Sequence, residues 1–266
     1  MTTANTHTFD AAPAIEARGL TKSYGGRTAV ADLSFAVHAG RVTGFLGPNG
    51  AGKSTTMRLL LGLERPEAGE ALIEGRPYAA LIAPMTRVGA LLDAKAFHKG
   101  RSARGHLLAL ARSQALPDAR VDAVLDLVGL SSVARKRAGG FSLGMAQRLG
   151  IAAALLGDPR IVLLDEPVNG LDPQGILWIR TLMKQLAAEG RAVLVSSHLM
   201  NEMAVTADHL LVIGQGRLLA DCPTAEFIER HTDPAVYAAT PHVARPALLE
   251  EAFMRLTAGA VQYSAH

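Results

Sequence analysis

The sequence predicts an α/β fold built around a parallel sheet. Residues 41–46 have the apolar character of a buried strand, and a glycine-rich turn separates them from residues 56–61, which are expected to form an amphipathic or buried helix. Residues 161–164 are four consecutive apolar residues, a run typical of a parallel strand that is covered on both faces. A helix at residues 174–188 and a strand at residues 192–196 continue the alternation of strand and helix. Together these observations favour one large α/β domain with additional segments.

An antiparallel β subdomain is expected before the parallel sheet. Residues 15–20 and residues 33–37 alternate apolar with small or polar residues, and the turn Tyr24-Gly25-Gly26 lies between them. Residues 72–75 read as a further short strand and turn. Residues 1–14 are polar and rich in threonine, without the basic and apolar regions of a signal peptide, so we expect a disordered tail there.

A helical insert is expected between two strands of the sheet, at about residues 94–157. The motif Leu116-Pro117-Asp118 marks a break between two of its helices. The main domain is expected to span residues 15–220, followed by a C-terminal extension at residues 221–266. Apolar residues recur in the insert at helical spacing, and these are Leu107, Leu108, Leu110, Val121, Val124, Leu125 and Val128.

The end of the chain is expected to contain a hairpin and a docked helix. Residues 210–213 should pair with residues 217–220 through the turn Gly214-Gln215-Gly216. A helix at residues 247–256 should pack on its own domain through one apolar face, which consists of Leu248, Leu249, Phe253 and Leu256.

Composition limits the possible classes of protein. A chain of 266 residues with 49% hydrophobic composition can bury a large core. Its one cysteine, Cys222, excludes an intramolecular disulfide, and we expect it to be a small buried residue. The net charge of +3 is mildly basic and Arg135-Lys136-Arg137 reads as a short solvated patch, so nucleic acid is not implied. The longest apolar stretch, residues 149–156, is less than half of a membrane span, so we expect a protein that is soluble or reaches a membrane through a partner.

A phosphate-binding loop is predicted at Gly47-Pro48-Asn49-Gly50-Ala51-Gly52-Lys53-Ser54-Thr55, which fits the pattern G-x-x-x-x-G-K-[ST] between a strand and a helix. Its glycines let backbone N–H groups turn inward around a phosphate, and the helix N-terminus adds unpaired donors and partial positive charge. We expect Lys53 to bridge the β and γ phosphates and the Ser54 hydroxyl to ligate Mg²⁺. Tyr24 is a candidate for stacking on adenine, with an ordinary hairpin tyrosine as the alternative. For the loop itself, the alternative is a plain glycine-rich turn.

An acidic pair, Asp165-Glu166, follows the apolar strand at residues 161–164. At the carboxyl end of a parallel strand, Asp165 can hold Mg²⁺ and Glu166 can orient the attacking water as general base. The alternative is two solvated acids that cap a strand. With the phosphate-binding loop, the pair indicates a RecA-like nucleoside triphosphatase that uses Mg²⁺, and neither motif specifies what work hydrolysis drives.

A third group of motifs resembles the ABC-transporter ATPases. The segment Phe141-Ser142-Leu143-Gly144-Met145-Ala146-Gln147-Arg148 lies between the two nucleotide motifs and is similar to the signature segment of that family. Asn169-Gly170-Leu171-Asp172 resembles the family's D-loop, and Ser197-His198 resembles its switch histidine. Order and spacing match over residues 15–220, which is more than three quarters of the chain.

The resemblance implies a homodimer in which two chains hold two ATP molecules between them. Ser142 and Gly144, at the start of a helix, would bind a nucleotide held by the second chain. His198 would hydrogen-bond the γ-phosphate, whereas a histidine after a strand is by itself more often a polar cap. Asp172 reads equally as the N-cap of the next helix, and Trp178 most simply as a packing residue.

The sequence departs from the family pattern at three positions. Leu143 and Met145 stand where the signature usually has a glycine and a glutamine. Asp93 stands where the family often has a glutamine that reaches Mg²⁺, and because an aspartate can also ligate Mg²⁺ it is a further candidate ligand. Exporter ATPases of the antibiotic-resistance and bacitracin-resistance type share this style of signature and the acidic residue, and that similarity favours export.

The leading interpretation is the ATP-hydrolysing subunit of a drug or antibiotic exporter. Its separate transmembrane permease would dock on the helical insert near residues 93–104. The protein would be cytoplasmic, lie at the cytoplasmic face of the cell membrane and contact the membrane only through the permease. The alternatives are an ABC importer ATPase, a soluble ABC ATPase that acts on nucleic acid or ribosomes, and a phosphotransferase that uses the same loop. Substrate contacts would lie in the permease, so the sequence does not identify the transported molecule.

Overall fold

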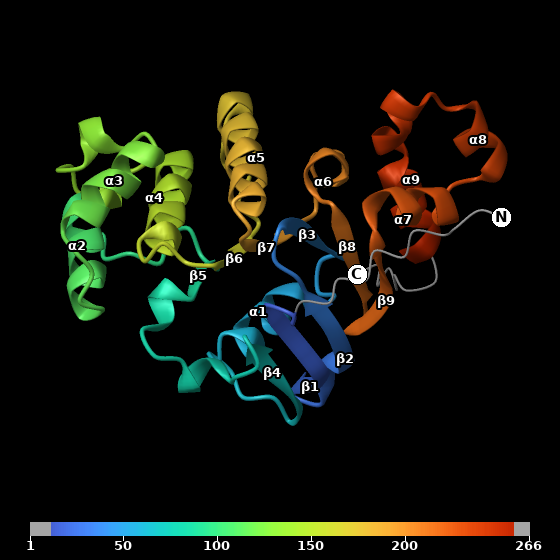
Figure 1. Ribbon diagram of the computed structural model, residues 1–266, viewed down its shortest axis with the longest axis horizontal. Coiled ribbons are helices and arrows are strands. Elements are labelled where there is room, and N and C mark those ends of the chain that lie inside the picture. The colour runs from blue at the N-terminus through green and yellow to red at the C-terminus, as the bar shows by residue number, and fades with distance from the viewer. Residues whose placement is uncertain (1–11, 258–266) are drawn as a thin grey trace.

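A six-stranded sheet forms the centre of the computed structural model, which describes residues 12–257 (Figure 1). The strands follow the order β5-β6-β7-β3-β8-β9, and all neighbours are parallel except β8 and β9. The α/β class is therefore confirmed. The strands are β3 (Arg41–Leu46), β5 (Val88–Leu91), β6 (Ile161–Asp165), β7 (Ala192–Ser197), β8 (His209–Gly214) and β9 (Arg217–Pro223).

The two faces of this sheet belong to two different cores, because successive side chains of a strand point to opposite faces. In β6, Val162 and Leu164 pack with the helices, whereas Ile161 and Leu163 pack with the antiparallel sheet and α1. Every residue of β7 and β8 is buried, which explains the apolar runs at residues 192–195 and 210–213 within these strands.

The antiparallel β subdomain is also confirmed. It is a three-stranded sheet of order β2-β1-β4, made by β1 (Ile15–Tyr24), β2 (Arg27–Val37) and β4 (Ala68–Ile73). Gly25 and Gly26 both have positive φ and form the turn between β1 and β2. Residues 1–11 of the expected N-terminal tail lie outside the described residues.

Helices cover the other face of the central sheet, and Figure 1 shows α2, α3 and α4 together on one side of it. Four of the helices begin at a side-chain cap: the side chains of Ser102, Ser142, Asp172 and Asp233 each accept a hydrogen bond from a backbone N–H in the first turn. The Asp172 cap was one of the two readings of that residue. The helices are α1 (Lys53–Leu60), α2 (Ala103–Ser113), α3 (Ala119–Leu127), α4 (Leu143–Leu155), α5 (Pro173–Ala188), α6 (Met200–Thr206), α7 (Thr224–His231), α8 (Pro234–Ala239) and α9 (Leu249–Thr257).

The C-terminal part folds onto the main domain. The predicted hairpin forms between β8 and β9, and β9 continues to Pro223. The helix expected at residues 247–256 begins two residues later, as α9, because a 3-10 helix at His242–Leu248 precedes it. Leu249 and Phe253 of α9 are buried in the core, so this helix docks on its own domain as expected. Cys222 is buried as well.

Among the described residues 12–257, no helix combines the length and the apolar character needed to cross a membrane.

Candidate functional site

The glycine-rich loop lies between the carboxyl end of β3 and the start of α1, and two of its glycines are required sterically. A Cβ on Gly47 would lie 2.5 Å from the carbonyl oxygen of Ile213. Gly52 has φ of 103°, and a Cβ there would lie 2.3 Å from the carbonyl oxygen of Ala29. The loop is therefore pressed against the backbone of β8 on one side and of β2 on the other, which fixes its shape.

Lys53 is held inside this loop. Its Nζ donates hydrogen bonds to the carbonyl oxygens of Gly47 at 2.6 Å and Pro48 at 3.2 Å, and only 7% of the residue is exposed. Burial lowers the pKa of Lys53, while the carboxylates of Glu166 and Asp165 act in the opposite direction. A buried ammonium group inside a ring of backbone groups is suited to bind the oxygens of a phosphate.

Ser54 and Asp165 meet although 111 residues separate them in the sequence. The Ser54 hydroxyl donates a hydrogen bond of 2.7 Å to Oδ2 of Asp165. The other carboxylate oxygen, Oδ1, accepts a hydrogen bond from the hydroxyl of Ser196, which lies near the end of β7. The pairing follows from the strand order, since β7 lies between β3 and β6 and all three end at the same edge of the sheet.

A hydroxyl and a carboxylate side by side are hard oxygen ligands of the kind that Mg²⁺ prefers. No group of three or more His, Cys, Asp or Glu in the described part of the chain has the arrangement of a metal site. Such a set is not needed for Mg²⁺, which is usually held by one or two protein ligands together with substrate phosphates. Ser54 and Asp165 therefore fit this ion.

Glu166 is fixed from three directions. Its backbone N–H donates to the Ser196 hydroxyl at 3.0 Å, and its carbonyl oxygen accepts a hydrogen bond of 3.1 Å from Nε2 of Gln147. Its carboxylate Oε2 lies 2.7 Å from Nδ1 of His198. The residue has a φ of 50°, a left-handed conformation that is uncommon outside glycine and that these contacts maintain.

Gln147 and Ser196 are residues to which sequence reasoning assigned no role. Gln147 is 2% exposed and belongs to the otherwise apolar face of α4. A polar amide among apolar helix positions indicates a specific hydrogen-bond partner, because buried polar side chains are nearly always hydrogen-bonded.

A pocket of about 410 Å³ opens above these residues. The rim includes Tyr24, which is 46% exposed and whose hydroxyl is hydrogen-bonded to Glu64. The predicted adenine-stacking residue and the phosphate-binding loop thus share one pocket. Its lining consists of Tyr24, Arg27, Ala29, Asn49, Gly50, Gly52, Lys53, Ser54, Thr55, Asp165 and Glu166.

Ser142 and Gly144 lie outside this pocket, at the start of α4. The Ser142 hydroxyl accepts the N–H of Met145 at 3.2 Å as the helix cap. A Cβ on Gly144 would lie 2.9 Å from the carbonyl oxygen of Gly170, so the signature segment touches the D-loop. Trp178 packs as expected, and the guanidinium carbon of Arg148 lies over its indole, 4.4 Å from the ring centre.

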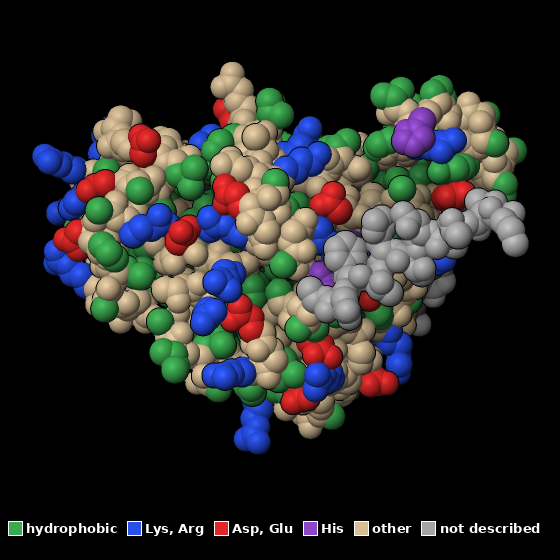
Figure 2. Space-filling model, viewed as in Figure 1, with side chains coloured by type: hydrophobic (Ala, Val, Ile, Leu, Met, Phe, Trp, Pro, Cys, Tyr) green, Lys and Arg blue, Asp and Glu red, His purple; other side chains and the backbone are tan. Residues whose placement is uncertain are grey.

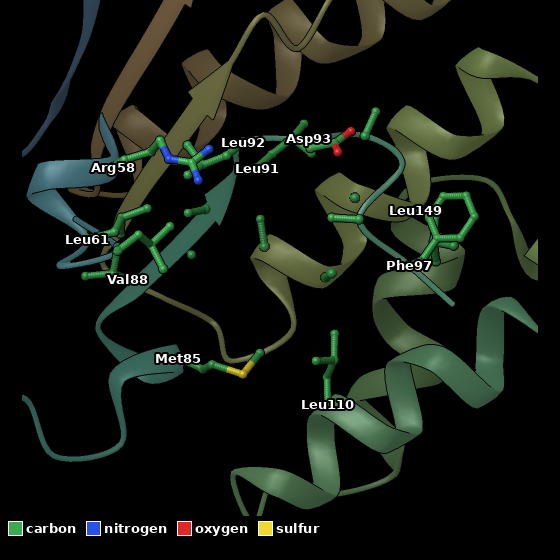
Figure 3. Close-up of a pocket in the computed structure, with 18 of the residues that line it drawn as sticks. Arg58, Leu61, Met85, Val88, Leu91, Leu92, Asp93, Phe97, Leu110 and Leu149 are labelled. Carbon is green, nitrogen blue, oxygen red and sulfur yellow. The ribbon is translucent and has the colours of Figure 1, made fainter. Parts of the chain in front are cut away.

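Asp93 lies in a different place. It belongs to a second pocket of about 430 Å³, between the end of β5, α4 and α2 (Figure 3). Oδ1 of Asp93 accepts a hydrogen bond from the backbone N–H of Lys95 at 2.8 Å. The structure does not bring Asp93 into the pocket of Ser54 and Asp165, and its role as a Mg²⁺ ligand stays a prediction.

We call this second pocket the apolar groove. Figure 3 shows Leu61, Met85, Leu110 and Leu149 around it, with Asp93 on the segment that leaves β5. Its polar members are few, and they are Arg58, Tyr78, Asp93 and His106.

A phosphate-binding loop after one parallel strand, facing an acidic pair after another, defines a nucleoside triphosphatase with a RecA-like fold. Residues 30–169 match the family described as ABC transporter. The chain belongs to this family and is an ATP-binding subunit that hydrolyses ATP.

Two curated relatives and one solved structure illustrate the relationship. The chain is 42% identical over 208 residues to the uncharacterized ABC transporter ATP-binding protein YhcH of Bacillus subtilis, covering 77% of this chain and 68% of the relative. It is 40% identical over 220 residues to the bacitracin transport ATP-binding protein BcrA of Bacillus licheniformis, covering 82% of this chain and 72% of the relative. A solved ATP-binding subunit of an ABC transporter has a TM-score of 0.78 at 25% identity and covers 91% of this chain and 99% of its own.

Proposed function

We propose that this chain is the ATPase subunit of an exporter that removes an antibiotic or a similar drug through a separate transmembrane permease. The observation that carries this proposal is the combination of a pocket formed by the phosphate-binding loop and the acidic pair with a second, apolar groove that lies outside it. The similarity to a bacitracin transport ATP-binding protein over 82% of the chain supports an antibiotic as cargo.

ATP would bind with its phosphates in the loop around Lys53 and its adenine against Tyr24. Ser54 and Asp165 would hold Mg²⁺, which supplies charge neutralisation on the phosphate oxygens. Asp93 could join them only if the segment after β5 approached the loop.

Hydrolysis requires a water in line with the γ-phosphorus. Glu166 would accept a proton from that water as it attacks, and the bond between the γ-phosphorus and the bridging oxygen would break to give ADP and phosphate. His198, which contacts Oε2 of Glu166, would donate a hydrogen bond to the γ-phosphate. Because His198 touches Glu166, it would couple the presence of that phosphate to the position of the base.

A second copy of the chain would complete the site. Ser142 and Gly144 lie at the N-terminus of a 13-residue helix, which offers a hydroxyl, an amide and the positive end of the helix dipole to a phosphate. Since they do not line the pocket of their own chain, they are suited to serve the nucleotide of the partner copy. ATP would then close a twofold dimer and hydrolysis would let it open.

The permease would dock in the apolar groove. The groove lies between β5 and the helices, and Asp93 and Leu92 connect it to the end of β5. A short apolar helix of the permease is the kind of element that such a groove accepts.

Copurification tests this proposal with a matched pair of variants. Leu63 lines the groove and is 60% exposed, whereas Leu177 on α5 is 57% exposed and lies away from the groove. We expect Leu63→Glu to reduce the recovery of a polytopic membrane protein with the tagged chain, and Leu177→Glu to leave it unchanged. Recovery of a ribosomal or nucleic-acid complex instead, or equal recovery by both variants, would contradict the proposal.

A further inference from the structure

The helical insert has a larger net positive charge than the protein as a whole. Residues 94–140 contain nine Lys and Arg and three Asp, a net charge of +6, whereas the whole chain has a net charge of +3. The remainder is therefore net acidic. Figure 2 shows Lys and Arg side chains along the edge of the molecule that α2 and α3 form.

Two segments bring five of these cations together. Residues 99–104 and 134–139 run antiparallel, held by backbone hydrogen bonds from Ala138 to Arg101 at 2.9 Å, from Gly139 to Lys99 at 3.0 Å and from Arg104 to Ala134 at 2.8 Å. We call this surface the basic ridge, and its exposed members are Lys99, Arg101, Arg135, Lys136 and Arg137.

The members of the basic ridge are not neutralised by the part of the chain that the structure describes. The nearest cation on the same two segments, Arg104, forms an ion pair with Asp122 at 2.8 Å. Among residues 12–257, no Asp or Glu forms an ion pair with any of the five ridge cations. Five cations without an acidic partner in the described part of the chain, on two segments joined by backbone hydrogen bonds, are suited to bind an anionic surface.

The position of the basic ridge indicates which anion it meets. Ala96 and Phe97 line the apolar groove, and the ridge begins two residues later at Lys99. A permease that docks in the groove therefore brings the ridge close to the membrane. Cytoplasmic loops of membrane proteins carry an excess of Lys and Arg, so the permease itself would repel the ridge, whereas the cytoplasmic leaflet is negatively charged.

Nucleic acid fits the ridge less well. Residues 99–104 and 134–139 contain no aromatic side chain on which a base could stack. Positive charge alone is available there, which suits a surface of headgroup phosphates.

We propose that the basic ridge is a direct contact surface for anionic phospholipid headgroups. It adds a second membrane contact to the one through the permease and so departs from the expectation that the chain contacts the membrane only through that partner. The proposal rests on the proposed function for the orientation of the chain, and the ridge holds the ATPase against the leaflet in the orientation that the groove requires.

Vesicle flotation of the purified full chain tests this without the permease. The probes are phosphatidylcholine vesicles with and without phosphatidylglycerol, each at low and high salt. We expect the chain to bind only the vesicles that contain phosphatidylglycerol. High salt should abolish this binding. The variant Arg135→Gln with Lys136→Gln and Arg137→Gln should lower the partition coefficient by about 10²-fold.

The control removes the same charge elsewhere, by Arg76→Gln, Lys184→Gln and Arg217→Gln, three exposed cations outside the ridge. It should bind as the wild type does, and both variants should keep the wild-type melting temperature and basal ATP hydrolysis. An equal loss in both variants, binding to pure phosphatidylcholine, or salt-sensitive binding of a short RNA that displaces the vesicles would overturn the proposal. Those outcomes leave the exporter function standing, because copurification with the permease tests that separately.

Discussion

Glu166 and His198 contact each other through their side chains, with Oε2 of the carboxylate 2.7 Å from Nδ1 of the imidazole. The two residues follow neighbouring strands, β6 and β7, so the sheet fixes the distance between them. Gln147 attaches α4 to the backbone of Glu166 at 3.1 Å. Because Ser142 begins that same helix, a displacement of the signature segment would be felt directly at the base.

Replacement of Glu166 by glutamine tests its role as general base. Glu166→Gln keeps the size of the side chain and a hydrogen-bonding group near His198, but removes the ability to take up a proton. We expect turnover to fall about 10²-fold or more while ATP still binds, measured as phosphate release. ATP-bound dimers should accumulate in size-exclusion chromatography. Glu229→Gln, at an exposed position on α7, is the control, and an unchanged rate in Glu166→Gln would remove the residue from its role.

Removal of the His198 side chain should distinguish ATP from ADP. His198→Ala loses the predicted hydrogen bond to the γ-phosphate, which ADP does not have. We therefore expect turnover to fall about 10²-fold and ATP to bind more weakly, with ADP affinity essentially unchanged. Isothermal titration with both nucleotides measures the difference. A parallel loss of ATP and ADP affinity would show that His198 acts only by maintaining the loop structure.

Local patterns predicted the parts of the site that are contiguous in sequence. The loop from Gly47 to Thr55 and the pair Asp165-Glu166 are short motifs, and each could be placed at a strand end. The hydrogen bond between Gln147 and Glu166, in contrast, depends on how α4 packs on the sheet, which no local pattern records. The position of Asp93 could not be predicted from a local pattern either, because the direction of the segment after β5 depends on tertiary packing.

Short elements were the part of the fold that the sequence did not predict. The helix α6 has seven residues and α7 has eight, too few to establish a helical period in the pattern. The strand β5 is the four residues Val-Gly-Ala-Leu and is stabilised by pairing with β6. Long apolar runs such as β6 and long helices such as α5 were predicted to within one residue at each end, because burial on both faces or a full helical period marks them.

The packing of β5 against α4 should tolerate no added methyl group. A Cβ on Gly89 would lie 1.8 Å from the carbonyl oxygen of Ala154 and 2.7 Å from its carbonyl carbon, both backbone atoms. Gly89→Ala should therefore destabilise the fold by about 1–3 kcal/mol or more. In a chain of this size that is a decrease in melting temperature of about 2–4 °C for each kcal/mol.

Gly140→Ala is the matched control for this change. No heavy atom lies within 4 Å of a Cβ at Gly140, and its φ is not in the left-handed region. Its melting temperature, measured by circular dichroism, should equal that of the wild type. Equal melting temperatures for Gly89→Ala and the wild type would mean that β5 and α4 can separate at little cost.

The half-buried His106 should make the protein sensitive to acid. Burial lowers the pKa of His106 below its ordinary value of 6.5, and the nearby Arg101 lowers it further. As the pH falls through about 6.5, the unfolded chain binds a proton that the folded chain does not, so the free energy of unfolding decreases. His106→Asn removes this proton uptake, and the melting temperature of the variant should decrease less than that of the wild type between about pH 7 and about pH 5. Burial and the nearby Arg230 also lower the pKa of His231, so this residue contributes in the same direction. The double variant His106→Asn with His231→Asn should therefore show a still weaker dependence of the melting temperature on pH. A melting temperature that falls equally steeply in the wild type and both variants would exclude these two imidazoles as the cause.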